Sequence, residues 1–375
     1  QDRPGLRELN VDMAYRFSDY GKSLTTDTYK IGADWAPVND VRFRTSYQRA
    51  IRAANIIELF TAQGFSLFDM DEDPCGPART ATLAQCVATG VPAAQYGNPA
   101  LDSPAGQYNV LQGGNPDLQP EESDTVTFGI VFTPSFWPGF FASVDYYDIQ
   151  IDETISTFGP TNTIDACYVN NDARACGRIR RNPANGSLWI GSGNVVDTNI
   201  NIGSLQTKGI DIQLGYNNLQ IGRAGKLNLT LQATSVDELI TEPGPGLDPY
   251  ECAGFFTLSC GTPTPEWRHR FRVAWITPWR DISLALTWRH IGSVKFFGNT
   301  NPNRLDAKLD AKDYFDLTGS WQINDKADLR IGINNVLDTE PPLSGTVGTT
   351  GNGNTYPQTY DALGRFIFGN LTWKF

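Results

Sequence analysis

Apolar and polar residues alternate strictly along much of this chain. In residues 225–234, for example, Leu227, Leu229 and Leu231 alternate with polar neighbours. Because successive side chains of a β-strand point to opposite faces, such runs predict strands with one apolar and one polar face. No amphipathic helix of three or more turns is predicted, so the fold class is all-β. The predicted strands are residues 7–17, 27–37, 41–51, 123–133, 140–152, 200–217, 225–240, 266–277, 281–292, 313–323, 327–337 and 364–375.

Short and long connections alternate between these twelve predicted strands. Bacterial outer-membrane barrels have short periplasmic turns and long extracellular loops. The pattern therefore predicts an antiparallel transmembrane β-barrel in the outer membrane, with a periplasmic C-terminus and extracellular long loops. The short connections lie around residues 37–40, 134–139, 217–225, 278–280 and 324–326, and the long ones are 52–122, 153–199, 241–265, 293–312 and 338–363.

Tryptophans give a second argument for the barrel. Six of the nine lie at or beside the predicted short turns: Trp35, Trp137, Trp275, Trp279, Trp321 and Trp373. An aromatic girdle at the membrane interface produces this clustering. A soluble β-sandwich also alternates apolar and polar residues, so the girdle and the loop lengths favour the barrel. Its apolar face is expected to meet lipid and its polar face to line the lumen.

The six cysteines fall into three close pairs, each inside a long loop. This spacing predicts three local disulfides in an oxidising compartment, Cys75–Cys86, Cys167–Cys176 and Cys252–Cys260. Free thiols are the alternative. A zinc site is not predicted, because no Cys-x-x-Cys occurs and both histidines lie elsewhere.

The net charge of −11 argues against nucleic acid as a partner, because no basic excess is present to neutralise phosphates. The chain has no Gly-x-Ser-x-Gly, no Gly-rich phosphate loop before a helix and no His-x-x-x-His. We therefore predict neither an enzyme nor a cofactor or metal site. The acidic run Asp71–Asp73 is predicted to be a solvated loop tip, with a cation site as the alternative.

Four segments carry more specific patterns. They are RAANIIELF at residues 52–60, GNPDLQPEES at 114–123, GSLQTKGIDIQ at 203–213, and the end of the chain from DALGR at 361–365 to LTWKF at 371–375. In the same order along the chain, these resemble motifs of TonB-dependent receptors of proteobacteria. Ala54 stands where that family usually has Pro, and Asp211 where it usually has Glu. A terminal Phe, here Phe375, also resembles the general signal that the barrel-assembly machinery reads.

The resemblance implies a barrel of about 22 strands with a plug inside. Residues 1–375 would then be the C-terminal portion of the barrel domain, with the plug domain and the TonB box absent from this sequence. The implied function is active uptake of a scarce nutrient, a ferric siderophore, cobalamin or an oligosaccharide, with energy from the TonB system. The implied partners are outer-membrane lipid and lipopolysaccharide, the transported ligand, and TonB through the missing N-terminal region.

Two other functions remain open. A complete twelve-stranded passive pore would require residues 7–17 to pair with residues 364–375. An outer-membrane barrel hydrolase would require a nucleophile and a base at the rim of the lumen. The strand pattern instead places His269 and His290 on the apolar face, where we expect interfacial packing.

Candidate ligand-binding residues come from the polar face and from one long loop. Arg268, Arg270 and Arg272 share the polar face of one predicted strand, and Arg289 has the same orientation on the next. Arg268, Arg270 and Arg289 lie nearer the long loops, where they could hold an anion by charge-assisted hydrogen bonds. The alternative is that they pair with carboxylates of the plug or of neighbouring strands. The resemblance implies that long outer loops capture the ligand, so the loop residues Trp189 and Arg178 are also candidates.

Overall fold

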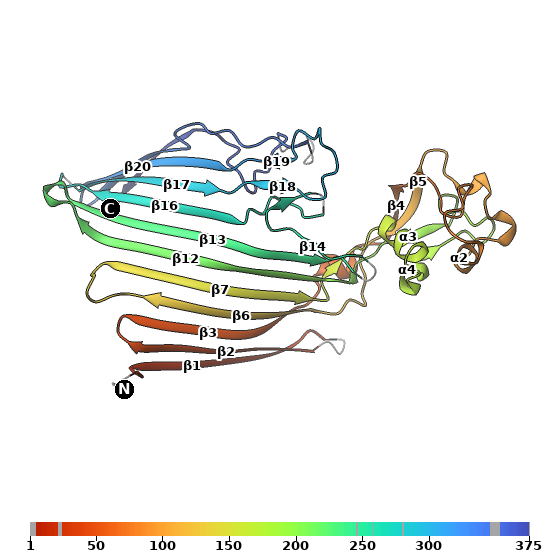
Figure 1. Ribbon diagram of the computed structural model, residues 1–375, viewed down its shortest axis with the longest axis horizontal. Coiled ribbons are helices and arrows are strands. Elements are labelled where there is room, and N and C mark those ends of the chain that lie inside the picture. Colours follow the sequence, from red (N-terminus) through yellow and green to blue (C-terminus); the bar gives the residue numbers. More distant parts are fainter. Residues whose placement is uncertain are drawn as a thin grey trace.

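The computed structural model describes the chain except for residues 1–4, 22–24, 245–246, 258, 280, 346–352 and 375. One large antiparallel sheet dominates it (Figure 1). No helix among the described residues is long and apolar enough to cross a membrane.

All twelve predicted strands are present, and their ends differ from the prediction by no more than four residues. Each strand pairs with the next predicted strand, so the sheet is an up-and-down meander. A short extra strand, β14 (Tyr250–Glu251), also pairs with β13. In sheet order the strands are β1 (Glu8–Asp19), β2 (Thr25–Val38), β3 (Val41–Arg52), β6 (Glu121–Phe132), β7 (Phe140–Asp152), β12 (Ser204–Gln220), β13 (Lys226–Glu242), β16 (Trp267–Ile276), β17 (Ile282–Ile291), β20 (Lys312–Asn324), β21 (Ala327–Asn334) and β22 (Phe366–Trp373).

The two outer strands of this sheet are β1 and β22. Among the residues that the structure describes, β1 pairs only with β2, and β22 pairs only with β21. A complete twelve-stranded pore requires residues 7–17 to pair with residues 364–375. That pairing is not present among the described residues, so the prediction of such a pore is wrong for this structure. An open sheet edge cannot remain in lipid, because each unpaired backbone group there costs several kcal/mol.

The strand register puts apolar side chains opposite one another across the sheet. Leu9 lies opposite Trp35, Leu286 opposite Leu317, and Leu329 opposite Leu371. Many of these side chains are exposed: Met13, for example, is 74 % exposed and Ile367 71 %. A continuous exposed apolar face over many strands is unfavourable in water and favourable against lipid tails.

The opposite face is polar and carries ion pairs between strands. Arg44 on β3 donates two hydrogen bonds to Asp145 on β7, both at 2.6 Å, across the intervening strand β6. Arg42 on β3 pairs with Glu8 and Asp34 on β1 and β2. This is the face that we expected to line the lumen.

The short turns lie together at the left in Figure 1, and the long loops lie at the right. Tryptophans gather at the short-turn end as predicted: the rings of Trp275 and Trp279 are 5.6 Å apart, and Trp137 stacks on Phe140 at 4.5 Å. The last strand ends there too, because Trp373 lies opposite Ala327 at the start of β21. Phe375, predicted on the same side, lies outside the described residues.

Two long loops join into a compact body that we call the distal unit, at the right in Figure 1. It comprises residues 53–119 and 153–203. Its core buries Leu101, Tyr108, Leu188 and Val195 around two disulfides. Its elements are α1 (Ile56–Phe60), β4 (Gly64–Asp69), α2 (Leu83–Ala88), η1 (Ala93–Gln95), η2 (Pro99–Leu101), β5 (Gln107–Gln112), β8 (Ile155–Ser156), α3 (Pro160–Tyr168), α4 (Ala173–Gly177), β9 (Ile179–Arg180), β10 (Asn194–Val196) and β11 (Ile200–Asn201).

A buried ion pair lies inside the distal unit. The Arg181 guanidinium donates to both carboxylate oxygens of Asp73 at 2.6 and 2.8 Å, and both side chains are 0 % exposed. Burial acts to lower the pKa of Arg181, but the Asp73 carboxylate and the Tyr168 hydroxyl outweigh it and raise that pKa. The prediction that Asp71–Asp73 is a solvated tip was therefore wrong for Asp73, which neutralises a buried cation.

Three further loops form a second small body, the proximal unit, from β15 (Phe255–Phe256), β18 (Val294–Phe296) and β19 (Lys308–Leu309). The side chains of Phe256, Val294, Leu309, Tyr356 and Tyr360 make up its core. The Cys252–Cys260 disulfide lies next to β15 in the sequence. Together with Cys75–Cys86 and Cys167–Cys176 in the distal unit, it confirms all three predicted disulfides. The remaining short helix, η3 (Gly222–Ala224), lies in the turn between β12 and β13.

Candidate functional site

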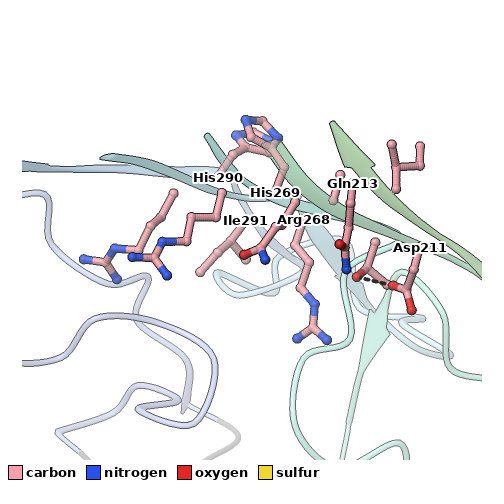
Figure 2. Close-up of a pocket in the computed structure, with 12 residues that line it drawn as sticks. Asp211, Gln213, Arg268, His269, His290 and Ile291 are labelled. Carbon is pink, nitrogen blue, oxygen red and sulfur yellow. Dashed lines mark hydrogen bonds between the residues drawn. The ribbon is translucent and has the colours of Figure 1, made fainter. Parts of the chain in front are cut away.

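The predicted arginines lie on the polar face of β16 and β17. Arg270 on β16 lies directly opposite Arg289 on β17. In Figure 2 the Arg268 side chain extends to the other side of the sheet from His269 and His290. The orientation predicted for Arg268 from strand alternation is therefore confirmed, and so is that of the two histidines.

A hollow of about 410 Å³ lies over the middle of β12 and β13 and the long-loop ends of β16 and β17 (Figure 2). Thr234 donates to Asp211 at 2.7 Å within it. Three guanidinium groups and one carboxylate make its polar lining net positive. Its lining residues on the polar face are Asp211, Gln213, Gln232, Thr234, Arg268, Arg270, Arg289 and Ile291, and the row between them, whose side chains lie on the apolar face, adds Ile212, Ala233, His269 and His290.

Arg289 is held by two carboxylates. Its guanidinium donates to both oxygens of Asp316 on β20, at 2.9 and 3.0 Å, and to Asp361 at 2.9 Å. It also lies over the ring of Tyr314, 5.1 Å from the ring centre. For Arg289 the structure therefore shows the alternative to ligand binding that the sequence analysis left open, which is pairing with carboxylates of neighbouring segments. Because Asp361 belongs to the loop before β22, Arg289 ties that loop to the barrel wall.

Arg268 and Arg270 differ from Arg289. In the part of the chain that the structure describes, neither has an ion pair, and their cross-strand neighbours on β13 are the neutral residues Thr234 and Gln232. A guanidinium presents five N–H donors and no acceptor. Two such groups without carboxylate partners can bind a carboxylate, a phenolate or a phosphate of a ligand.

Arg178 and Trp189 lie elsewhere, in the distal unit, and neither lines the hollow. Arg178 donates to the backbone carbonyls of Val196 and Thr198 at 2.9 and 3.0 Å, and burial lowers its pKa. The Trp189 ring packs against the core of the unit, and its N–H points to the carbonyl of Ala100 at 3.3 Å. Both contribute to the structure of the unit, and their part in ligand capture stays a prediction.

Asp361 and Gln213 were missed by sequence reasoning. Asp361 gives no local signal, because it reaches Arg289 from a loop 72 positions away. Gln213 could have been found by extending the alternation argument to β12, where it shares the polar face with Asp211. Among the described residues, no group of three or more His, Cys, Asp or Glu side chains is placed to hold a metal ion.

Comparisons with known proteins agree with the barrel fold. A family model described as "TonB dependent receptor-like, beta-barrel" matches residues 3–336. A search of curated proteins found no match. Among solved structures, a mutant ferric enterobactin receptor of Pseudomonas aeruginosa in complex with enterobactin is 16 % identical, with a TM-score of 0.64 over 99 % of this chain and 43 % of that one.

A siderophore receptor of Acinetobacter baumannii is similar at 13 % identity, with a TM-score of 0.60 over 98 % of this chain and 43 % of that chain. Identities this low establish the fold alone. The chain spans less than half the length of these receptors.

Proposed function

Because the chain belongs to the TonB-dependent receptor β-barrel family, whose members are outer-membrane transporters rather than enzymes, we propose that it is the C-terminal part of a receptor for active nutrient uptake. Residues 1–375 would supply about twelve strands of a barrel of about 22 strands. The plug and the TonB box would be supplied by sequence outside this chain. In this arrangement the short turns are periplasmic, and the distal and proximal units are extracellular.

The ligand that we propose is an anionic ferric siderophore. The observation that carries this choice is the pair Arg268 and Arg270 at the long-loop end of β16, two guanidinium groups that have no carboxylate partner among the described residues. A neutral oligosaccharide would not require unpaired cations there. The similar solved structures are also siderophore receptors, one of them in complex with enterobactin.

In the proposed mechanism, the ligand meets the extracellular units first and then enters the hollow beside β16 and β17. Arg268 and Arg270 hold its anionic groups by charge-assisted hydrogen bonds. The inner-membrane motor, acting through TonB on the plug, then opens a path through the lumen. Outer-membrane lipid and lipopolysaccharide surround the apolar face.

Equilibrium binding to the purified receptor tests the role of the two arginines, with ferric enterobactin as the anionic probe. Replacing either arginine by glutamine removes a charged donor, so affinity should fall about tenfold. Arg330→Gln is the matched control, because Arg330 lies on the polar face of β21 outside the hollow, near the ring of Phe368. The ligand assignment would be wrong if Arg268→Gln and Arg270→Gln bound the probe as tightly as Arg330→Gln.

A further inference from the structure

A cluster of polar and aromatic side chains lies on the apolar, lipid-facing side of the sheet, at the long-loop ends of three neighbouring strands. We call it the rim cluster. Its members are Trp267 and His269 on β16, Trp288 and His290 on β17, and Asp313 on β20. His269 and His290 also belong to the lining of the hollow, but their side chains lie on the other side of the sheet from Arg268, so the proposed transport mechanism does not use them.

The members of the rim cluster are joined by specific hydrogen bonds. The indole N–H of Trp267 donates to Nδ1 of His269 at 2.9 Å. The indole N–H of Trp288 donates to Oδ1 of Asp313 at 2.7 Å, and Nδ1 of His290 lies 2.8 Å from the same oxygen. The His269 and His290 rings are stacked, with their centres 5.0 Å apart. The cluster is therefore ordered before any partner binds.

These bonds fix which atoms are left for a partner. Because Nδ1 of neutral His269 accepts a hydrogen bond, its proton must lie on Nε2, which is then a donor. In neutral His290 the Nδ1 proton faces the Asp313 carboxylate, which leaves Nε2 as an acceptor. Oδ2 of Asp313 is a second acceptor, and 48 % of that side chain is exposed. One donor and two acceptors beside flat aromatic rings match the hydroxyl groups and C–H faces of a sugar.

The position of the cluster indicates which sugar it can reach. On β16, three apolar residues of the same face, Phe271, Val273 and Trp275, separate His269 from the short-turn end. At about 3.3 Å per residue, His269 lies roughly 20 Å along the strand from Trp275, in the half of the apolar face nearer the loops. This is the level of the outer leaflet, whose headgroups carry saccharides. A phosphate is disfavoured, because it would meet the Asp313 carboxylate and the cluster contains no Lys or Arg.

We propose that the rim cluster binds a sugar of an outer-leaflet glycolipid, the saccharide part of lipopolysaccharide. The proposal rests on the orientation given in the proposed function, with the long loops on the outside of the outer membrane, and it is independent of which nutrient is transported. A transition metal fits less well, because His269 would have to lose its Nε2 proton and its hydrogen bond from Trp267. A boundary glycolipid bound here would hold the receptor in a defined contact with the outer leaflet.

The test is native mass spectrometry of the full receptor purified from outer membranes and mixed with rough lipopolysaccharide, or with the same lipopolysaccharide after its phosphates are removed. Trp267→Leu and His290→Leu should each weaken binding of both probes about five- to tenfold. Trp321→Leu is the matched control, because Trp321 lies on the same face at the short-turn end and, like Trp267, is 37 % exposed. Heat-modifiable gel mobility first shows that each variant is folded, and the milder Trp267→Phe replaces any variant that is not.

Three results would overturn the proposal. Loss of binding on removal of the phosphates would mean that charge, and not the sugar, is recognised. Equal weakening by Trp321→Leu would mean that the protein adheres to lipid through its whole apolar face. Unchanged lipopolysaccharide binding in the rim variants, together with zinc binding that only the unmodified receptor shows, would assign the cluster to a metal.

Discussion

The buried pair of Asp73 and Arg181 should be the most sensitive point of the distal unit. Asp73→Asn keeps the shape of the side chain and an oxygen for the backbone N–H of Cys75, which Oδ1 of Asp73 accepts at 2.8 Å. It removes the charge and replaces Oδ2, which accepts from Arg181, by an NH2 donor. The Arg181 guanidinium, 0 % exposed, then remains as a buried cation without a counterion. Breaking such a pair from one side costs about 3–5 kcal/mol.

Hydrogen exchange of the backbone amides in α3 and β10 measures this cost as the free energy of opening the unit. The expected loss corresponds to exchange that is faster by a factor between about a hundred and a few thousand. Asp172→Asn is the matched control. Asp172 caps α4 and pairs with Arg174, which is 76 % exposed, so asparagine keeps the cap and loses about 1 kcal/mol at most.

A double variant separates the buried charge from general disruption of the core. Adding Arg181→Met to Asp73→Asn removes the uncompensated cation and supplies an apolar side chain, so part of the lost stability should return. The reasoning is refuted if Asp73→Asn speeds exchange no more than Asp172→Asn does.

Three other predictions concern the loops. Replacing Cys75 and Cys86 together by serine should destabilise the distal unit by about 2–3 kcal/mol, measured by the same exchange experiment, and no loss would mean that the disulfide does not constrain the unit. Cys252→Ser frees Cys260, which is half-buried, and a membrane-impermeant maleimide should label it on intact cells; labelling only in spheroplasts would reverse the predicted orientation. Asp361→Asn removes one of the two carboxylates on Arg289, so the amides of Tyr356 and Tyr360 should exchange faster, and unchanged exchange would show that this ion pair does not anchor the loop.

Strand positions and facing could be predicted because both are local properties of the sequence. Alternation over ten residues identifies β16 and the side of the sheet on which Arg268 and His269 lie. Each short turn then forces the two strands that it joins to pair, and the pairings across the long loops follow from the up-and-down order of an antiparallel barrel. The disulfides were predictable for the same reason, since each joins cysteines 8 to 11 positions apart.

The distal unit could not be predicted, because its contacts are not local. Arg181 and Asp73 are 108 positions apart and come from two different loops. The elements of the unit are short, from two to nine residues, so none shows a periodicity that can be distinguished from loop sequence. The same limit applies to the site, where alternation identified Arg289 but not its partner Asp361.

Uptake of radioactive iron by whole cells tests the central claim most directly. Cells that produce the full receptor are supplied with ferric enterobactin, with and without a functional TonB protein, and compared with cells that produce the Arg268→Gln, Arg270→Gln double variant. Our account predicts rapid uptake that requires TonB and falls at least tenfold in the double variant. Uptake that continues without TonB would contradict active transport, and uptake that is unchanged in the double variant would contradict the assignment of the arginine pair to the ligand.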